Sequence, residues 1–422
     1  MFKHKKIALF LVGLFALAGC TKPPVDSVPD GTTSQEKSKV RLQVWGPLEE
    51  KEMYVQNAAA FQALYPNIEF KVDYGEVGEP DAAKNVLADT ETSADVFLFP
   101  DDQLGKLVDK EVIASLPTAL ADKVKARDNA SAVDAATMND TMYGFPITAD
   151  NGYFLVYNKD FLNEEDVKTL EGIMAKTTAE HQLVVDLGNA YYSTSFIQYI
   201  SDISFDAITE THTTNFDSQD SVDAIEGVIN ILRHRKDNGF KSVDFNGAGL
   251  DDLLDINGNK AIAGVTGNWN ILKLKEILGD RLGTAKLPTF KNSKGVDVQW
   301  GSFAGSKLVG VKASSQHLAV ALAFADFMTD EAAQMRRYEA NGWGPSNKAV
   351  AADEKLAGEL GLIALAAQAP YAIPQGKSVG GKFWDNAAAV GNFILDGPAD
   401  TEPGTPQTVQ EVLTAFVSAI TA

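Results

Sequence analysis

Residues 94–102 read Ala-Asp-Val-Phe-Leu-Phe-Pro-Asp-Asp, an apolar run that ends in a pair of carboxylates. An apolar run without polar alternation is typical of a strand that is buried on both faces, as in a parallel sheet. Before it come an alternating strand pattern at 40–45, a helical pattern at 49–64 and a second alternating strand pattern at 68–72. Strands and helices that alternate in this way predict an α/β sheet.

The rest of the chain continues this alternation. Further strands are expected at 153–157, 182–187, 260–265 and 307–311, and further helices around 193–203, 219–237, 317–338, 353–369 and 405–421. A length of 422 residues predicts two or three compact units. The formal net charge of -20, from 37 Lys and Arg against 57 Asp and Glu, disfavours nucleic acid and anionic lipid as ligands.

The N-terminus has the pattern of an export signal. Three lysines within the first six residues precede the apolar run 7–17, which is too short to span a bilayer. Leu17-Ala18-Gly19-Cys20 follows and resembles the bacterial lipobox, in which cleavage leaves the cysteine first and diacylglycerol alkylates its thiol. Because Cys20 is the single cysteine, no intrachain disulfide is possible.

This pattern predicts a lipoprotein signal peptide over 1–19, a lipidated Cys20 and a flexible lipid-anchored linker over 20–38, rich in Pro, Asp, Ser, Thr and Lys. Two or three acyl chains, at about 0.8 kcal/mol per buried CH₂, hold a domain durably on a membrane. The expected location is extracytoplasmic, on the outer face of the bacterial cell membrane. A signal peptide without lipidation is the alternative.

Signatures of enzymes and of metal sites are mostly missing. The histidines that remain after signal cleavage share no metal-ligand spacing. Ser302 stands one place early for a nucleophile elbow. The segment 255–259 begins like a calcium loop, but Lys260 follows where glycine is required and Thr266 stands where a glutamate belongs. The sequence predicts no metal, no cofactor and no catalytic residue.

Two carboxylate pairs, Glu49-Glu50 and Asp101-Asp102, lie just beyond the ends of predicted parallel strands. Ligands of open α/β sheets bind at that edge. Carboxylates at this edge are suited to accept hydrogen bonds from sugar hydroxyls, and two flanking carboxylates also cleave glycosidic bonds in hydrolases. Both interpretations stay open at this point.

Aromatic side chains point to sugar as well, because the C–H faces of sugar rings stack on flat aromatic surfaces. Trp269 and Tyr191 each follow a predicted strand. Trp384 is expected in a loop, where an exposed aromatic is less easily explained by packing. Phe99 ends its strand beside the carboxylates, and a core position is the alternative to a ligand contact there.

The chain resembles the extracellular solute-binding proteins of ABC sugar importers, and most of all the maltose/maltodextrin-binding proteins. The similarity runs in segments from about Val40 to the C-terminus. Its most specific segments, in this order and spacing, are ADVFLFPDD at 94–102, YGFPI at 143–147, VYNKD at 156–160, GNW at 267–269 and LPTF at 287–290.

The resemblance implies two α/β lobes, crossed more than once by the chain, that close on a sugar in the cleft between them. The implied lobes are an N-lobe of 39–149 and 305–348 and a C-lobe of 150–304 and 349–422. The implied hinge lies near 146–151 and 301–305, where short loops absorb a change in φ and ψ. A monomer is the family expectation.

The resemblance also implies roles for individual residues. Phe99 stands where the family has a stacking aromatic, and Asp102, next to Asp101, stands where it has an acid that binds hydroxyls. Asp150 or Asn151 matches an acidic ligand, the choice being blurred by a one-residue insertion. The residues that match the aromatic platforms of the C-lobe are Tyr191, Trp269 and Trp384.

Three positions depart from the family pattern. The segment 46–51 differs from that of maltose binders, which weakens the assignment of Glu49 and Glu50 as ligands. Asn189 stands where an acidic sugar ligand is common, and Gln103 stands where the family often has arginine. These changes leave sugar as the expected class and the exact sugar open.

The expected function is therefore that of a lipid-anchored receptor. It captures maltose or maltodextrin, which are α-1,4-linked gluco-oligosaccharides, for delivery to the permease subunits of an ABC transporter. Another oligosaccharide or a polyamine is the alternative cargo. A secreted glycosidase that uses the two carboxylate pairs is the alternative from another class.

Overall fold

The computed structural model describes residues 37–206, 209–245, 249–257, 260–398, 405 and 407–422. The predicted signal peptide, Cys20 and the predicted linker as far as residue 36 lie outside the described residues. Lys39–Ala422 forms one unit and is described by itself below. Within the described part of the chain, no helix has the length and hydropathy needed to cross a membrane.

The first sheet contains the predicted apolar strand near its centre. Its strands, in spatial order, are β2 (Ile68–Glu76), β1 (Ser38–Gly46), β3 (Val96–Pro100), β17 (Lys307–Val311) and β6 (Gly144–Pro146). All five residues of β3 are buried, as predicted. β3 runs parallel to β1 but antiparallel to β17, so the expected parallel sheet is in fact mixed.

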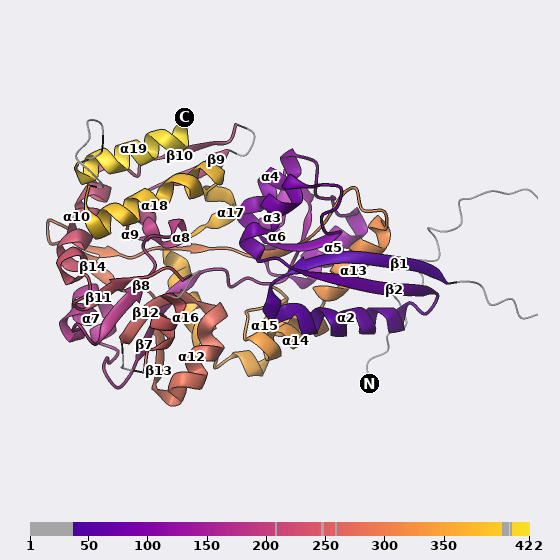
Figure 1. The fold of residues 1–422 in the computed structure, drawn as a ribbon, viewed down its shortest axis with the longest axis horizontal. Helices are drawn as coiled ribbons and strands as arrows, with labels where there is room; N and C mark the ends of the chain where they lie inside the picture. The colour runs from indigo at the N-terminus through magenta and orange to yellow at the C-terminus, as the bar shows by residue number, and fades with distance from the viewer. Residues whose placement is uncertain (1–36, 207–208, 246–248, 258–259, 399–404, 406) are drawn as a thin grey trace, which may run out of the picture. The chain divides into compact units, whose positions relative to one another are not determined.

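Helices from two distant parts of the chain pack on this sheet (Figure 1). The helices are α2 (Lys51–Leu64), α3 (Glu79–Ala88), α4 (Leu104–Asp109), α5 (Thr118–Arg127), α6 (Ala130–Ala135) and α13 (Leu318–Met328). A further helix, α14 (Glu331–Asn341), packs on α2 and α13. Phe61 of α2, Phe70 of β2 and Phe324 of α13 lie ring to ring, with the Phe70–Phe324 centroids 5.0 Å apart. These rings join the two parts of the chain into one core.

The prediction of one long helix over 317–338 is wrong. α13 ends at Met328, because the hydroxyl of Thr329 donates back to the carbonyl of Ala325 and Asp330 caps a new helix. The Asp330 carboxylate accepts from the backbone N–H of Ala333 at 2.8 Å, which is an N-cap of α14. A continuous apolar stripe therefore concealed a helix boundary.

The second sheet has strand order β11 (Phe240–Ser242), β8 (Gln182–Val185), β12 (Ala261–Gly267), β7 (Tyr153–Asn158) and β13 (Leu282–Ala285). β8 runs parallel to β11 and β12, whereas β7 runs antiparallel to β12 and β13. The remaining strand pairs are short: β9 (Ile203–Asp206) with β10 (Thr211–Thr214), β14 (Thr289–Lys291) with β15 (Asp297–Gln299), β16 (Ser302–Ala304) with β18 (Ala372–Pro374), and β4 (Thr137–Met138) with β5 (Thr141–Met142).

The helices of the second half are, in chain order, α7 (Leu170–Lys176), α8 (Ala190–Ser193), α9 (Ser195–Gln198), α10 (Gln219–Leu232), α11 (Gly249–Leu254), α12 (Ile271–Leu278), α15 (Lys348–Ala351), α16 (Leu360–Gln368), α17 (Gln375–Ser378), α18 (Gly381–Asp396) and α19 (Val409–Thr421). The predicted loop around Trp384 is wrong, because Trp384 lies in the first turn of α18. Phe383, Ala387, Val390 and Ile394 recur at helical spacing and are all buried.

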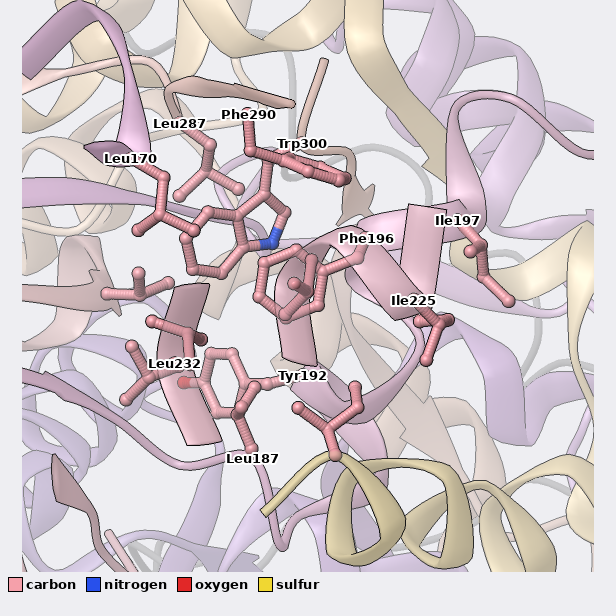
Figure 2. Close-up of a cluster of buried hydrophobic side chains, with 14 of the residues drawn as sticks. Leu170, Leu187, Tyr192, Phe196, Ile197, Ile225, Leu232, Leu287, Phe290 and Trp300 are labelled. Atoms are coloured by element: carbon pink, nitrogen blue, oxygen red, sulfur yellow. The ribbon is translucent and has the colours of Figure 1, made fainter. Parts of the chain in front are cut away.

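The two sheets have separate hydrophobic cores. The core of the first sheet draws buried residues from 40–147 and 308–328. The second sheet contributes to two cores: a larger one, called the second core below, with buried residues from 153–303 and 379–420, and a smaller one with buried residues from 154–282 and Ala364. Figure 2 shows part of the second core, in which Trp300 stacks on Phe196 with ring centroids 4.2 Å apart. Trp300 is 0% exposed, and its indole N–H donates to Ser195 Oγ at 2.7 Å. The chain therefore passes between the cores near 147–153 and 303–308, close to the two hinge segments that the resemblance implied.

Candidate ligand-binding cleft

The structure brings both predicted carboxylate pairs to one edge of the first sheet. Asp101 and Asp102 begin a short 3-10 turn directly after β3, and Glu49 and Glu50 belong to the turn directly after β1. Because β1 and β3 are parallel, their carboxyl ends meet at the same edge, as the sequence predicted. The two pairs nevertheless have very different surroundings.

Asp102 contacts a segment that belongs to the second half of the chain. Gln375 Nε2, at the start of α17, donates to Asp102 Oδ1 at 2.5 Å. Gln375 Oε1 in turn accepts from Asn151 Nδ2 at 3.2 Å. Burial raises the pKa of Asp102 to about 7, while the hydrogen bonds from Gln375 and Trp384 act in the opposite direction. Asp102 is thus a carboxylate that changes protonation near neutral pH.

Asp101 lies deeper than Asp102. It is 4% exposed, and its pKa lies well above the usual range because it is buried and because Asp102 is close. The backbone N–H of Gly376 in α17 donates to it. Gly305 makes room for its carboxylate, since a Cβ at that position would lie only 2.8 Å from Asp101 Oδ1. The glycine in this chain connection therefore allows the two lobes to approach closely here.

The three predicted aromatic platforms meet beside this carboxylate pair. The Tyr191 ring lies 6.4 Å from both the Trp269 and the Trp384 rings, and the three side chains are partly buried. The ring of Phe303 stacks on Tyr191 at 5.7 Å, and Tyr191 Oη is buried without a partner. Tyr191, Trp269 and Trp384, which the resemblance implied as aromatic platforms, therefore form one aromatic group, and Phe303 is a member that the sequence analysis missed.

A glycine sets the position of Trp269. The indole ring folds back over Gly267, where a Cβ would lie 2.0 Å from ring atom Cζ3. The family segment GNW therefore has a physical reason for its first residue. Any side chain at position 267 would push the indole out of the aromatic group.

Asn189 supports the aromatic group rather than lining it. Its Oδ1 accepts from the backbone N–H of Tyr191 at 3.0 Å and so caps α8. Its side chain also hydrogen-bonds Asp186. Both ends of the amide are therefore engaged within the fold, and in this conformation Asn189 orients Tyr191 from behind.

Two predicted ligand residues lie in the interior instead. Phe99 is 0% exposed and its ring lies 5.5 Å from that of Phe97, so the structure corrects its expected place on the cleft surface to the core. Glu50 is also 0% exposed and forms an ion pair with Arg337, which is 2% exposed. Glu49 remains exposed. In a strand buried on both faces, alternation cannot tell which aromatic faces a ligand, and this explains the error for Phe99.

The two residues at the one-residue ambiguity, Asp150 and Asn151, have different hydrogen-bond partners. Asp150 is 8% exposed, and its Oδ2 accepts from Asn268 Nδ2 at 3.0 Å and from the backbone N–H of Gly344. Asp150 therefore joins the chain segments of Asn268 and Gly344, which is a structural role. Asn151 points the other way, into the Gln375 and Asp102 network. Of the two, only Asn151 joins the candidate cleft.

Sequence reasoning also missed the residues of α17. Gln375 contacts Asp102, Gly376 contacts Asp101, and Lys377 forms an ion pair with Asp134 of α6. The separation of Gln375 from Asp102 is 273 residues, so no local pattern indicated the contact. A different signal was available, because Pro374 and the two glycines at 376 and 380 mark a chain turn next to the predicted platform Trp384.

A cavity of about 440 Å³ adjoins this group at Phe303 and Asn151. It adjoins the connections at 149–152 and 302–305 and is lined on one side by Leu356, Leu362 and Leu365. Tyr191, Trp269 and Trp384 do not line it. The aromatic and carboxylate side chains, rather than this cavity, carry the chemistry expected of a sugar site.

Comparison with known proteins identifies the family. A model of the bacterial extracellular solute-binding proteins matches residues 56–360. The chain belongs to this family. A curated relative, the multiple sugar-binding protein of Streptococcus mutans, is 25% identical over 236 residues, which cover 51% of this chain and 54% of the relative. The chain thus matches about half the length of that relative.

Solved structures of solute-binding proteins extend the likeness to almost the whole chain. A structure with acarbose aligns with a TM-score of 0.79 at 26% identity, over 91% of this chain and 99% of the other. The maltodextrin-binding protein from L. casei BL23 aligns with a TM-score of 0.74 at 25% identity, over 92% and 100%. The maltotriose-binding protein of Thermus thermophilus shares the fold with a TM-score of 0.72 at 20% identity, over 90% and 99%. The expected two-lobe α/β fold of this family is confirmed.

Proposed function

We propose that the chain is the substrate-binding protein of an ABC importer and captures maltose or maltodextrin, with the aromatic group of Tyr191, Trp269 and Trp384 as the sugar platform. The observation that carries the proposal is that this group lies beside the carboxylates of Asp101 and Asp102. Flat aromatic faces bind the C–H face of a sugar, and acids and amides bind its hydroxyl edge. Both kinds of contact are available in one place.

The names of the similar proteins support this class of cargo. The L. casei protein is a maltodextrin-binding protein, and the Streptococcus mutans relative is a multiple sugar-binding protein. The second name also supports the alternative of another oligosaccharide. The interior positions of Phe99 and Glu50 favour a cleft whose contacts differ from those of typical maltose binders.

The proposed lobes keep the expected boundaries: 39–149 and 305–348, and 150–304 and 349–422. The separate cores of the two sheets support this division. Closure of the lobes follows from a ligand that touches both, since only the closed state gains all of its contacts. The affinity suited to release into a permease is micromolar, or about -8 kcal/mol.

The proposed site of membrane attachment is Cys20, behind the predicted signal peptide. The sequence Leu17-Ala18-Gly19-Cys20 supports it. Labelling of growing cells with a fatty-acid probe should mark the wild-type protein and leave Cys20→Ala unmarked. Equal labelling of both would contradict lipid attachment at this residue. The expected oligomeric state is a monomer, which sedimentation of the soluble fragment measures directly.

The cargo is tested by titrating the soluble fragment 39–422 while tryptophan fluorescence is followed. The panel contains maltose, maltotriose, maltotetraose, lactose, raffinose and spermidine. Saturable binding of the malto-series alone supports the proposal, and binding of lactose or raffinose moves the specificity to another oligosaccharide. Binding of spermidine that weakens strongly with salt would identify a polyamine receptor, because cation capture is screened by salt.

The hydrolase alternative has its own assay. Release of reducing ends from maltodextrin after long incubation would support a glycosidase, and absence of release would remove it. The burial of Glu50 in an ion pair with Arg337 disfavours a direct catalytic role for that acid. A binding protein leaves its sugar chemically unchanged.

A further inference from the structure

We propose that Gln375 is a specificity-determining residue, whose side-chain amide competes with the sugar for the carboxylate of Asp102. This inference rests on the proposed function, because it concerns the same cleft. Gln375 is 4% exposed, and its Nε2 donates to Asp102 Oδ1 at 2.5 Å. This amide lies on Asp102, and its neighbours hold it there, so a sugar that binds the same carboxylate oxygen has to compete with it.

The position of Gln375 is held by its neighbours along α17. Three consecutive residues of α17 each contact an aspartate of the first lobe: Gln375 contacts Asp102, the Gly376 N–H contacts Asp101, and Lys377 contacts Asp134. α17 itself lies beside β9, in the second half of the chain (Figure 1). The segment thus reaches across the cleft at three successive points.

The side-chain orientation of Gln375 is fixed as well. An amide has one acceptor end and one donor end. Asn151 Nδ2 donates to Oε1 of Gln375 at 3.2 Å, which directs the donor end, Nε2, toward Asp102. Asn151 lies in the connection between the two lobes. It therefore acts as a positioning residue for the contact.

The chemistry of the contact is that of a sugar hydroxyl. When it is ionised, the Asp102 carboxylate offers lone pairs only, so each of its partners must then be a donor. The Trp384 indole, one of the proposed platforms, already hydrogen-bonds this carboxylate. A sugar stacked on Trp384 brings its hydroxyl edge to Asp102, and there the Gln375 amide already donates to Oδ1. A sugar hydroxyl that binds Oδ1 competes with the Gln375 amide, and a ligand without suitably placed hydroxyls cannot replace that contact.

The test compares four proteins: the wild type, Gln375→Met, Gln375→Ala and Gln62→Met. Methionine keeps the length of glutamine and removes the donor, and alanine is a second variant in case methionine packs badly. Gln62→Met is the matched control, because Gln62 donates to backbone carbonyls of Tyr65 and Ile68 in the first lobe. Circular dichroism verifies that each variant is folded.

If the Gln375 amide competes with the sugar, both Gln375 variants should bind the preferred sugar with a Kd lower by about two- to tenfold. This factor is the equivalent of one net hydrogen bond. Asn151→Ala should shift the Kd in the same direction by a smaller factor, and Gln62→Met should leave it within about twofold. A higher Kd in the Gln375 variants would overturn the proposal, because it would make Gln375 a sugar ligand. An unchanged Kd would overturn it too.

A second readout needs no sugar. Because Gln375 joins the lobes at Asp102, the Gln375 variants should have a larger radius of gyration in solution scattering than the wild type and Gln62→Met. If no sugar in the panel binds the wild type, the proposed function fails. The solution-scattering comparison still tests whether Gln375 joins the lobes at Asp102. An unchanged radius of gyration in both Gln375 variants would overturn the contact itself.

Discussion

The side-chain nitrogen of Asn268 lies 3.0 Å from Oδ2 of Asp150 and also donates to the carbonyl oxygen of Gly342 at 2.6 Å. Asn268 directly follows β12 in the second lobe, and Gly342 directly follows α14 in the first. Asp150 lies in the chain connection between the two lobes. One amide therefore fastens three chain segments at the hinge, immediately beside the proposed platform Trp269.

Asn268→Ala should lower the free energy of unfolding by about 1–3 kcal/mol, because it leaves a buried carbonyl unpaired and removes a donor from a buried carboxylate. Urea unfolding measures this change. The matched control is Asn270→Ala, since Asn270 is also buried but donates only locally, to Thr266. Its loss should cost about 1 kcal/mol. Equal losses in the two variants would contradict a fastening role for Asn268.

The ion pair of Glu50 and Arg337 predicts a second stability effect. Glu50→Gln should destabilise the protein by about 3–5 kcal/mol, because it leaves the charge of Arg337 buried without its partner. The exposed neighbour offers the control, and Glu49→Gln should change stability by less than about 0.5 kcal/mol.

Replacing both partners, as in Glu50→Met with Arg337→Met, should recover most of the loss. If the double variant folds and binds sugar as the wild type does, Glu50 is not a sugar ligand. Lost sugar binding in a stably folded double variant would return Glu50 to the list of ligands.

Asp102 predicts how stability depends on pH. Its pKa of about 7 in the folded protein lies above the ordinary value for an aspartate, so the folded state binds a proton that the unfolded state releases. The contribution of Asp102 to the free energy of unfolding should therefore fall as pH rises from about 4 to about 7 and stay flat above that.

Asp102→Asn removes this titration. The difference in the free energy of unfolding between the wild type and Asp102→Asn should therefore slope downward across pH 4–7, as measured by urea unfolding at several pH values. Parallel curves for the two proteins would show that burial does not raise the pKa of Asp102.

Two tryptophans should separate affinity from stability. Trp269 is partly exposed in the aromatic group, so Trp269→Ala should weaken sugar binding by at least about tenfold, with a small change in unfolding. Trp300 is fully buried, so Trp300→Ala should cost about 3–5 kcal/mol of stability. Calorimetric titration and denaturant unfolding measure the two quantities. Unchanged sugar affinity in a folded Trp269→Ala would count against the proposed platform.

The sequence by itself determined the elements whose patterns are local. The alternating residues of 40–45 and the apolar run at 94–100 predicted β1 and β3, and the carboxylates after them predicted the ligand edge. Trp384 was within reach of the same reasoning, because Phe383, Ala387, Val390 and Ile394 already follow a helical period. The error there was a missed pattern and not a missing signal.

Only the tertiary structure decided which polar groups meet. Gln375 and Asp102 are 273 residues apart, and Asn268 and Asp150 are 118 residues apart. Phe99 turned inward because every residue of β3 is buried, so its strand has no exposed side for an alternation to reveal. Hydropathy records burial one residue at a time. A hydrogen bond between lobes depends instead on how two folded sheets are placed, and that placement is a property of the whole chain.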